Sequence, residues 1–215
     1  ITFKENKVHD FAWFASKNWA VQVATLKIKD TNKEVTAYVG HNPAHTNGWK
    51  DVMQYIQNTL DTYSEHVGTY PYETVKVAEG ALEAGGGMEY PTVTVVQQSD
   101  DPIFVEQVTV HEVGHNWFYG ILANNERTSP WLDESINSFY ERKTVTPSML
   151  PSSGIMNAIE QATIQAYDHY QSLQPLCGHS AHFTNMNYGL DLYQKGPDYI
   201  EYLEAYMGAD AFKKG

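Results

Sequence analysis

Part of the first forty positions shows hydrophobic residues at every second place, which is the period of half-buried strands. Trp19, Val21 and Val23 lie two residues apart. The turn-forming residues 30–33 (Asp-Thr-Asn-Lys) separate them from a second β-branched run at 35–39. We expect residues 1–40 to form a hairpin or a small sheet. Short β-branched segments at 75–77 and 92–96 predict two further strands.

Apolar residues recur at helical spacing in the next segments. Residues 49–67 carry Val52, Ile56, Leu60 and Tyr63 on one face and stop at Gly68. The mostly apolar run at 104–118 predicts a largely buried helix that stops at Gly120.

The second half of the chain also favours helices. Ser129-Pro130 is typical of an N-cap followed by proline at the first helical position, which places Glu134 in the second turn of a helix. After residue 143 a helical pattern is broken at Pro147, Pro151 and 177–182. Residues 197–207 predict a last helix with an apolar packing side made by Tyr199, Ile200, Leu203, Tyr206 and Met207.

Composition narrows the class of protein. A chain of 215 residues is long enough for one large domain or two small ones. Its net charge of -12 argues against nucleic acid as a partner. The single cysteine, Cys177, excludes an internal disulfide framework, and no apolar stretch is long enough to span a membrane. Because the chain begins at Ile1 without methionine, we expect a fragment of a longer protein, and its compartment stays unknown.

The motif with the clearest chemistry is His111-Glu112-Val113-Gly114-His115, followed by Glu134 after eighteen intervening residues. On a helix, residues four apart lie roughly 40° from each other around the axis, so the two imidazoles can bind one ion. Glu134 would be the third ligand and leave a coordination position open. Glu112, beside the histidines, is placed to act as general base on water. These residues predict a hydrolytic site with one Zn²⁺ per chain.

A second motif, Gly85-Gly86-Gly87-Met88-Glu89-Tyr90, precedes the strand predicted at 92–96. Glycines let another backbone approach closely, so this segment could pair with an extended peptide and place Glu89 near its end. The alternative is a flexible loop ahead of a strand.

Other polar residues are further candidates for a role at the metal or in a second metal site. Glu141, seven residues after Glu134, could orient a zinc-bound histidine, or it could be a surface carboxylate paired with Arg142 or Lys143. A second metal site at Cys177, His179 and His182 lacks a fourth ligand. Pro43 argues against a helical His41–His45 pair.

The HEVGH motif, the distant Glu134 and the GGGMEYP segment together resemble the zinc aminopeptidases of the gluzincin clan, such as aminopeptidase N and the leukotriene-hydrolysing aminopeptidase. The likeness covers roughly residues 45–207. Gly87-Met88-Glu89 matches the family's G-x-M-E-N segment, with Tyr90 in place of asparagine. Residues 131–135 resemble W-L-N-E-G, with Asp133 and Ser135 substituted. Tyr193-Gln194-Lys195-Gly196 fits the family's Y-x-K-G context.

This resemblance implies a fold and residue roles. The fold would be α+β, a thermolysin-like zincin catalytic domain at 41–215, mostly helical with a small mixed sheet. Residues 1–40 would be the end of a preceding β domain or leading strands. Glu89 would bind the substrate's α-amino group beside Gly86, Gly87 and Met88, and Tyr193 would stabilise the oxyanion. The partners would be peptides with a free N-terminus and the flanking domains of the longer protein.

The expected function is therefore zinc-dependent hydrolysis of N-terminal peptide bonds. Two alternatives stay open. A thermolysin-type endopeptidase also carries HExxH and a downstream glutamate, though at nineteen intervening residues by family analogy. A non-catalytic scaffold could retain the fold, but such proteins usually lose the ligands or the base, and here all are present.

Overall fold

The computed structural model describes residues 4–83, 85–145, 162–163, 165–166, 169 and 174–214. The chain folds into two compact units, Ile1–Ala123 and Asn124–Gly215. The helical pattern expected to break at Pro147 and Pro151 lies outside the described residues.

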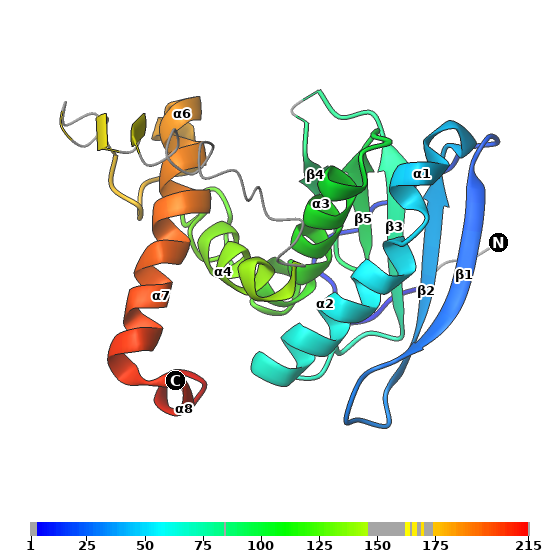
Figure 1. Ribbon diagram of the computed structural model, residues 1–215, viewed down its shortest axis with the longest axis horizontal. Coiled ribbons are helices and arrows are strands. Elements are labelled where there is room, and N and C mark those ends of the chain that lie inside the picture. Colours follow the sequence, from blue (N-terminus) through cyan, green and yellow to red (C-terminus); the bar gives the residue numbers. More distant parts are fainter. Residues whose placement is uncertain are drawn as a thin grey trace. The chain divides into compact units, whose positions relative to one another are not determined.

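The first unit is built on a sheet that, in the described residues, has five strands in the order β1-β2-β3-β5-β4 (Figure 1). The strands are β1 (Ala20–Lys27), β2 (Glu34–His41), β3 (Thr74–Gly80), β4 (Gly87–Met88) and β5 (Val93–Gln97). β1 and β2 form an antiparallel hairpin, while β2, β3 and β5 run parallel. β4 returns antiparallel to β5 at the end of the sheet. These pairings confirm the hairpin within residues 1–40, the two later strands and the small mixed sheet.

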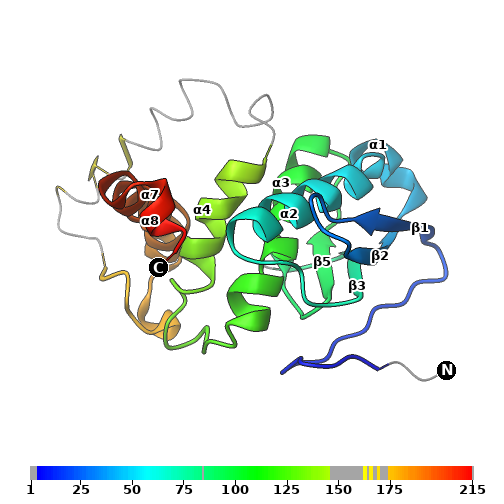
Figure 2. The same cartoon turned by 90° about the horizontal axis from the view of Figure 1, so that it is seen from below.

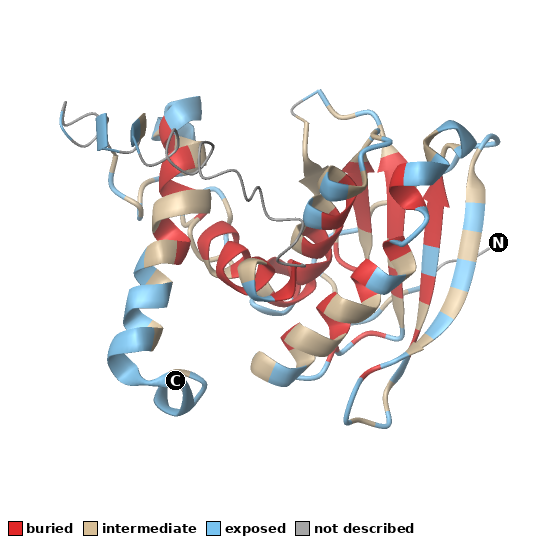
Figure 3. Cartoon of the chain, viewed as in Figure 1, coloured by how far each residue is buried: buried red, intermediate tan, exposed pale blue. Residues whose placement is uncertain are grey.

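Helices cover one face of this sheet (Figures 1 and 2). They are η1 (Pro43–His45), α1 (Thr46–Trp49), α2 (Val52–His66), α3 (Pro102–Gly114) and the π-helical turn η2 (Asn116–Ile121). Figure 3 shows the buried residues on β2, β3, β5 and the inner sides of α2 and α3. The aliphatic part of the core between them is made by Val35, Val39, Ile56, Leu60, Val77, Val96, Val105 and Val113. The helix expected over 49–67 is thus confirmed in its main part.

The second unit packs short helical segments around α4 (Glu134–Thr144). These are η3 (Ser180–His182), α6 (Asn185–Asn187), the π-helical segment η4 (Tyr188–Lys195), α7 (Gly196–Met207) and α8 (Ala209–Phe212). The ring of Phe139 in α4 contacts that of Phe212 in α8, with centroids 5.6 Å apart.

The last predicted helix is confirmed as α7, but its predicted packing side is wrong. Within the described residues Tyr199, Leu203 and Tyr206 are 52%, 49% and 90% exposed. The reason is that α7 is held to α4 by its buried first residues and by ion pairs. Arg142 bonds Asp198 at 2.7 Å and Lys143 bonds Glu204 at 2.7 Å. Polar contacts, rather than the apolar stripe, attach this helix.

Across the part of the chain that the structure describes, no helix combines the length and the apolar character needed to cross a bilayer.

Candidate metal centre

Helix α3 carries the histidine motif and is defined by its first residues. The Asp101 side chain accepts a hydrogen bond from the Ile103 N–H at 3.0 Å, and Pro102 follows at the first helical position. Behind this cap, Val105, Val110 and Val113 are buried. The cap and the buried valines together hold α3 in place. The motif lies at the C-terminal end of this helix.

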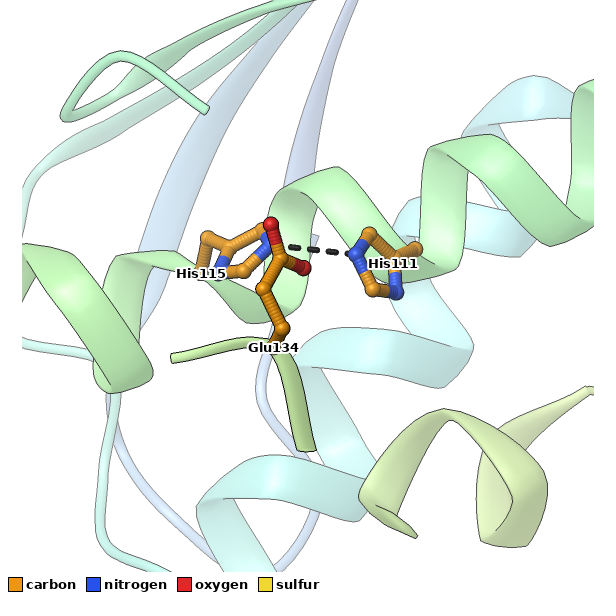
Figure 4. Close-up of side chains that lie close together, drawn as sticks. All are labelled: His111, His115 and Glu134. Carbon is orange, nitrogen blue, oxygen red and sulfur yellow. Dashed lines mark hydrogen bonds between the residues drawn. The ribbon is translucent and has the colours of Figure 1, made fainter. Parts of the chain in front are cut away.

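The two imidazoles of the motif face each other (Figure 4). Nε2 of His111 lies 3.1 Å from Nε2 of His115, and the ring planes are nearly perpendicular, at 86°. Tetrahedral zinc with Zn–N bonds of about 2.0–2.1 Å places two ligand nitrogens roughly 3.3 Å apart. The pair therefore fits two positions of one zinc ion.

A backbone carbonyl fixes the orientation of His115. This residue is buried, and its Nδ1 lies 2.9 Å from the carbonyl oxygen of Phe118. Because a carbonyl only accepts, Nδ1 carries the hydrogen and Nε2 carries the lone pair. That is the tautomer a metal-binding histidine needs.

The carbonyl reaches His115 because the chain leaves helical geometry at this point. Phe118 has φ -94° and ψ 80°, and Tyr119 has φ 137° and ψ -60°. The helix predicted through residue 118 is thus not continuous: α3 ends at Gly114, η2 spans Asn116–Ile121, and the kink lies at Phe118 and Tyr119. The kink directs the Phe118 carbonyl back toward the imidazole.

Glu112 is buried and lies against β4. Thr94 Oγ1 donates to its carbonyl oxygen at 3.1 Å, which ties α3 to β5. A Cβ atom on Gly87 would lie 2.4 Å from Cγ of Glu112 and 2.5 Å from its Oε1. The glycine at this position is therefore what allows the strand to pass so close to the carboxylate.

The same strand brings Glu89 to the motif. Glu89, Glu112 and His115 each offer one ligand atom, and these atoms lie within 4.8 Å of one another. Gly85 and Gly86 ahead of them have φ of +77° and +68°, the left-handed region that favours glycine. β4 ends the sheet, so it is an edge strand, as the proposed pairing with a peptide requires.

Glu134 and Glu141 belong to the second unit, on α4; Figure 4 also draws Glu134. The helix begins at Glu134 itself, and the Asp133 side chain accepts from its N–H at 3.2 Å. The expected N-cap at Ser129 is therefore wrong. Helix-type hydrogen bonds nevertheless start earlier, because the Glu134 N–H donates to the Pro130 carbonyl at 3.0 Å.

Tyr193 lies on η4, and its ring centroid is 6.0 Å from that of Tyr188. The segment is anchored by buried Leu190, Asp191 and Leu192. Burial raises the pKa of the Asp191 carboxyl, and Lys195 partly offsets this effect.

Sequence reasoning missed Asn116, the residue that follows the motif. Its side chain is buried, with Oδ1 accepting from the Thr92 N–H at 2.8 Å and Nδ2 donating to the Val113 carbonyl at 2.9 Å. Thr92 has φ +65°. Asn116 thus holds the turn after β4 against α3. The only signal in the sequence is a polar residue inside an apolar run.

The sites set aside from the sequence stay unsupported within the described ranges. The rings of His179 and His182 are exposed and inclined at 38° to each other, and the possible ligand groups include neither of them nor Cys177. Pro43 lies in the short segment η1, and His45 Nδ1 bonds the buried Glu79 carboxylate.

A model of the peptidase family M1 domain matches residues 51–215, most of the chain. The chain belongs to peptidase family M1. The resemblance drawn from the motifs is thereby confirmed, and each motif described above falls inside the matched M1 region.

The M1 chain is similar to several curated proteins. A leucyl aminopeptidase of Saccharolobus solfataricus is 24% identical over 213 residues, covering 88% of this chain and 26% of the relative. Aminopeptidase M1-C of Oryza sativa subsp. japonica is 27% identical over 173 residues, covering 73% of the chain and 20% of the relative. The chain thus spans about a quarter of the length of the relatives it matches.

Solved structures share the M1 fold. An M1 zinc metallopeptidase from Deinococcus radiodurans has a TM-score of 0.64 at 19% identity, covering 91% of this chain and 42% of that one. Legionella pneumophila aminopeptidase A, solved with aspartic acid, has a TM-score of 0.64 at 14% identity, covering 91% and 23%. The α+β fold expected from the sequence is confirmed.

Proposed function

We propose that this chain is the catalytic domain of a zinc-dependent aminopeptidase. The observation that carries the proposal is the convergence of Glu89, Glu112 and His115 in the first unit, with ligand atoms within 4.8 Å of one another. A carboxylate beside the hydrolytic motif suits a substrate with a charged amino terminus. Membership of family M1 and relatives named aminopeptidases support the same function.

His111, His115 and Glu134 would hold the zinc ion. The fit of the imidazole pair and the tautomer fixed by Phe118 support the first two ligands. The HExxH-x18-E spacing and the name of the Deinococcus neighbour, a zinc metallopeptidase, support the set. A bound zinc ion would supply Lewis acidity and lower the pKa of a coordinated water. Glu141, buried on the same helix as Glu134, would orient a ligand.

Glu112 would be the general base. Its carboxylate would take a proton from the attacking water and later deliver it to the nitrogen of the leaving amine. Burial excludes bulk water from this carboxylate. The Tyr193 hydroxyl would donate a hydrogen bond to the oxygen on which negative charge develops.

Glu89 would select the N-terminal peptide bond. Its carboxylate would bind the substrate ammonium, while Gly86, Gly87 and Met88 present an edge strand for the peptide backbone. With the ammonium held at this position, the first peptide bond is the one brought to Glu112. Peptides with a free N-terminus are the proposed substrates.

The test measures hydrolysis of aminoacyl amides by the complete protein, with free and N-acetylated amino groups. Glu112→Gln should lose turnover by a factor of about a hundred or more while keeping its zinc content. Glu89→Gln should raise KM for free-amine substrates by about ten- to a hundredfold, the worth of a charge-assisted hydrogen bond. The control is Glu83→Gln, which alters an exposed carboxylate on the same connection.

Contrary outcomes separate the alternatives. A protein without zinc, or equal rates for Glu112→Gln and the parent, would favour the scaffold. If the parent protein prefers N-acetylated substrates or internal peptide bonds, and Glu89→Gln keeps that preference unchanged, the endopeptidase is favoured. The flanking domains as partners, and residues 1–40 as the end of a β domain, are part of this proposal and need the complete protein for their test.

A further inference from the structure

Ser135 links the helix that begins at Glu134 to the segment that carries Tyr193. Its side chain is fully buried within the second unit, and Oγ donates to the carbonyl oxygen of Leu192 at 2.8 Å. Gly196 lies on the other side, where an added Cβ would be 2.1 Å from Oγ of Ser135. The contact between α4 and η4 is thus as close as glycine permits, and one hydroxyl joins the two.

The hydrogen-bond pattern of η4 explains why this hydroxyl is needed. In a π-helix each N–H donates to the carbonyl five residues earlier, as the Gly196 N–H does to Asp191. The next carbonyl, Leu192, would pair with the nitrogen of residue 197. That residue is proline, which has no N–H. Ser135 therefore supplies the donor that the backbone lacks.

Arg142 on the same helix holds the next two carbonyls. Its Nη2 donates to the carbonyl oxygen of Gln194 at 3.2 Å and approaches that of Tyr193 at 3.5 Å. Its Nη1 bonds Asp198 at 2.7 Å, which keeps the guanidinium in place. Three consecutive carbonyls, those of Leu192, Tyr193 and Gln194, are thus bonded by side chains of α4.

We propose that Ser135 is a positioning residue that sets the place of Tyr193 relative to α4, with Arg142 in support. The proposal rests on the function proposed above, in which Glu134 is a ligand and the Tyr193 hydroxyl stabilises the oxyanion. Ser135 stands where the resembling W-L-N-E-G segment has glycine, so its hydroxyl is a feature of this chain. It acts through the backbone and touches no reacting atom.

The test is a double-mutant cycle on the complete protein, with kcat, KM and zinc content measured for an aminoacyl amide. Ser135→Ala keeps Cβ and removes the donor, so kcat should fall about five- to fiftyfold, as expected for a buried carbonyl left without its partner. KM and zinc content should stay unchanged. In the Tyr193→Phe background the same substitution should have no further effect, because the hydroxyl it positions is gone.

A second pair of variants decides the matter if Ser135→Ala does not fold. Arg142→Gln removes the hydrogen bonds to η4 together with ion pairs to α7, whereas Lys143→Gln removes an ion pair to α7 and the contact with the Phe139 ring but leaves the Arg142 contacts with η4 in place. Arg142→Gln should lower kcat in the parent and not in Tyr193→Phe, and Lys143→Gln should leave kcat unaltered.

Equal losses of kcat with and without the Tyr193 hydroxyl would show a merely structural role and overturn the inference. If Ser135→Ala keeps the parent's kcat while Tyr193→Phe loses it, the inference about Ser135 is overturned and the proposed function stays intact. Full activity of Tyr193→Phe would remove Tyr193 from the mechanism, and the inference with it.

Discussion

Replacement of Gly196 by alanine is expected to destabilise the second unit. The new Cβ would lie 2.1 Å from Oγ and 2.5 Å from Cβ of Ser135. Rotation of the serine hydroxyl relieves only the first contact, because Cβ is fixed to the α4 backbone. The two helical segments must therefore move apart.

The magnitude follows from three contributions. Overpacking of a closely packed contact costs about 1–3 kcal/mol. Displacing the Ser135 hydroxyl from the Leu192 carbonyl costs about 1 kcal/mol more. Alanine in place of glycine inside a helix returns about 1 kcal/mol. The free energy of unfolding should thus fall by about 1–3 kcal/mol.

The assay is urea unfolding followed by circular dichroism, with Gly189→Ala as the matched control. Gly189 lies on the same segment η4, and a Cβ there meets no atom within 4 Å, so this variant should be neutral or slightly stabilised. In a Ser135→Gly background, Gly196→Ala should cost much less, because both serine atoms that the new Cβ meets are gone and only the Asp191 carbonyl oxygen, 3.2 Å away, remains close. If Gly196→Ala costs the same in both backgrounds, the steric reasoning is refuted.

Three other outcomes are expected. Chelation of zinc should abolish hydrolysis and lower the melting temperature, and added zinc should restore both. In His111→Ala the melting temperature should no longer respond to zinc, whereas in the control His182→Ala it should respond as in the parent. Asn116→Ala should lower the free energy of unfolding in urea by about 1–3 kcal/mol, because it leaves the Thr92 N–H without its partner and removes one hydrogen bond to the Val113 carbonyl; a loss under 0.5 kcal/mol, the usual range for a surface substitution, would contradict this role. Burial, with the negative charges of Glu106 and Asp51, raises the pKa of Tyr55 to about 12 from its ordinary 10.0. On raising the pH, the unfolded state loses the Tyr55 proton before the folded state does, so this contribution to stability is complete below pH 10 and is lost as the pH rises toward 12. In unfolding measured at each pH, Tyr55→Phe should lose less stability over this range. An equal slope in both proteins would argue against this role of Tyr55.

Much of the fold was predictable because its signals are local. The hairpin follows from two β-branched runs around a turn, and α3 follows from Asp101-Pro102 and an apolar run. Alternation does not say which face is buried, however. In β1 the valines Val21 and Val23 are 64% and 59% exposed, whereas the residues that alternate with them along the strand are partly buried.

The pairing of the two histidines was predictable, and the groups that support them were less so. The spacing of the motif suffices to place His111 and His115 side by side on a helix. The kink at Phe118 leaves no mark in the hydrophobic pattern, because apolar residues continue through it. The start of α4 was misplaced since Ser129 and Asp133 are equally good caps, and tertiary packing decides between them.

The tautomer of His115 depends on a main-chain carbonyl, and this limits which sequence changes can alter it. No single side-chain replacement can delete a carbonyl, so the polarity of this imidazole is insensitive to most point changes nearby. The arrangement depends instead on the number of residues between His115 and Phe118. Inserting or deleting one residue between positions 115 and 118 would carry the acceptor away, so we expect homologues to vary in the identity of those residues and to keep their number.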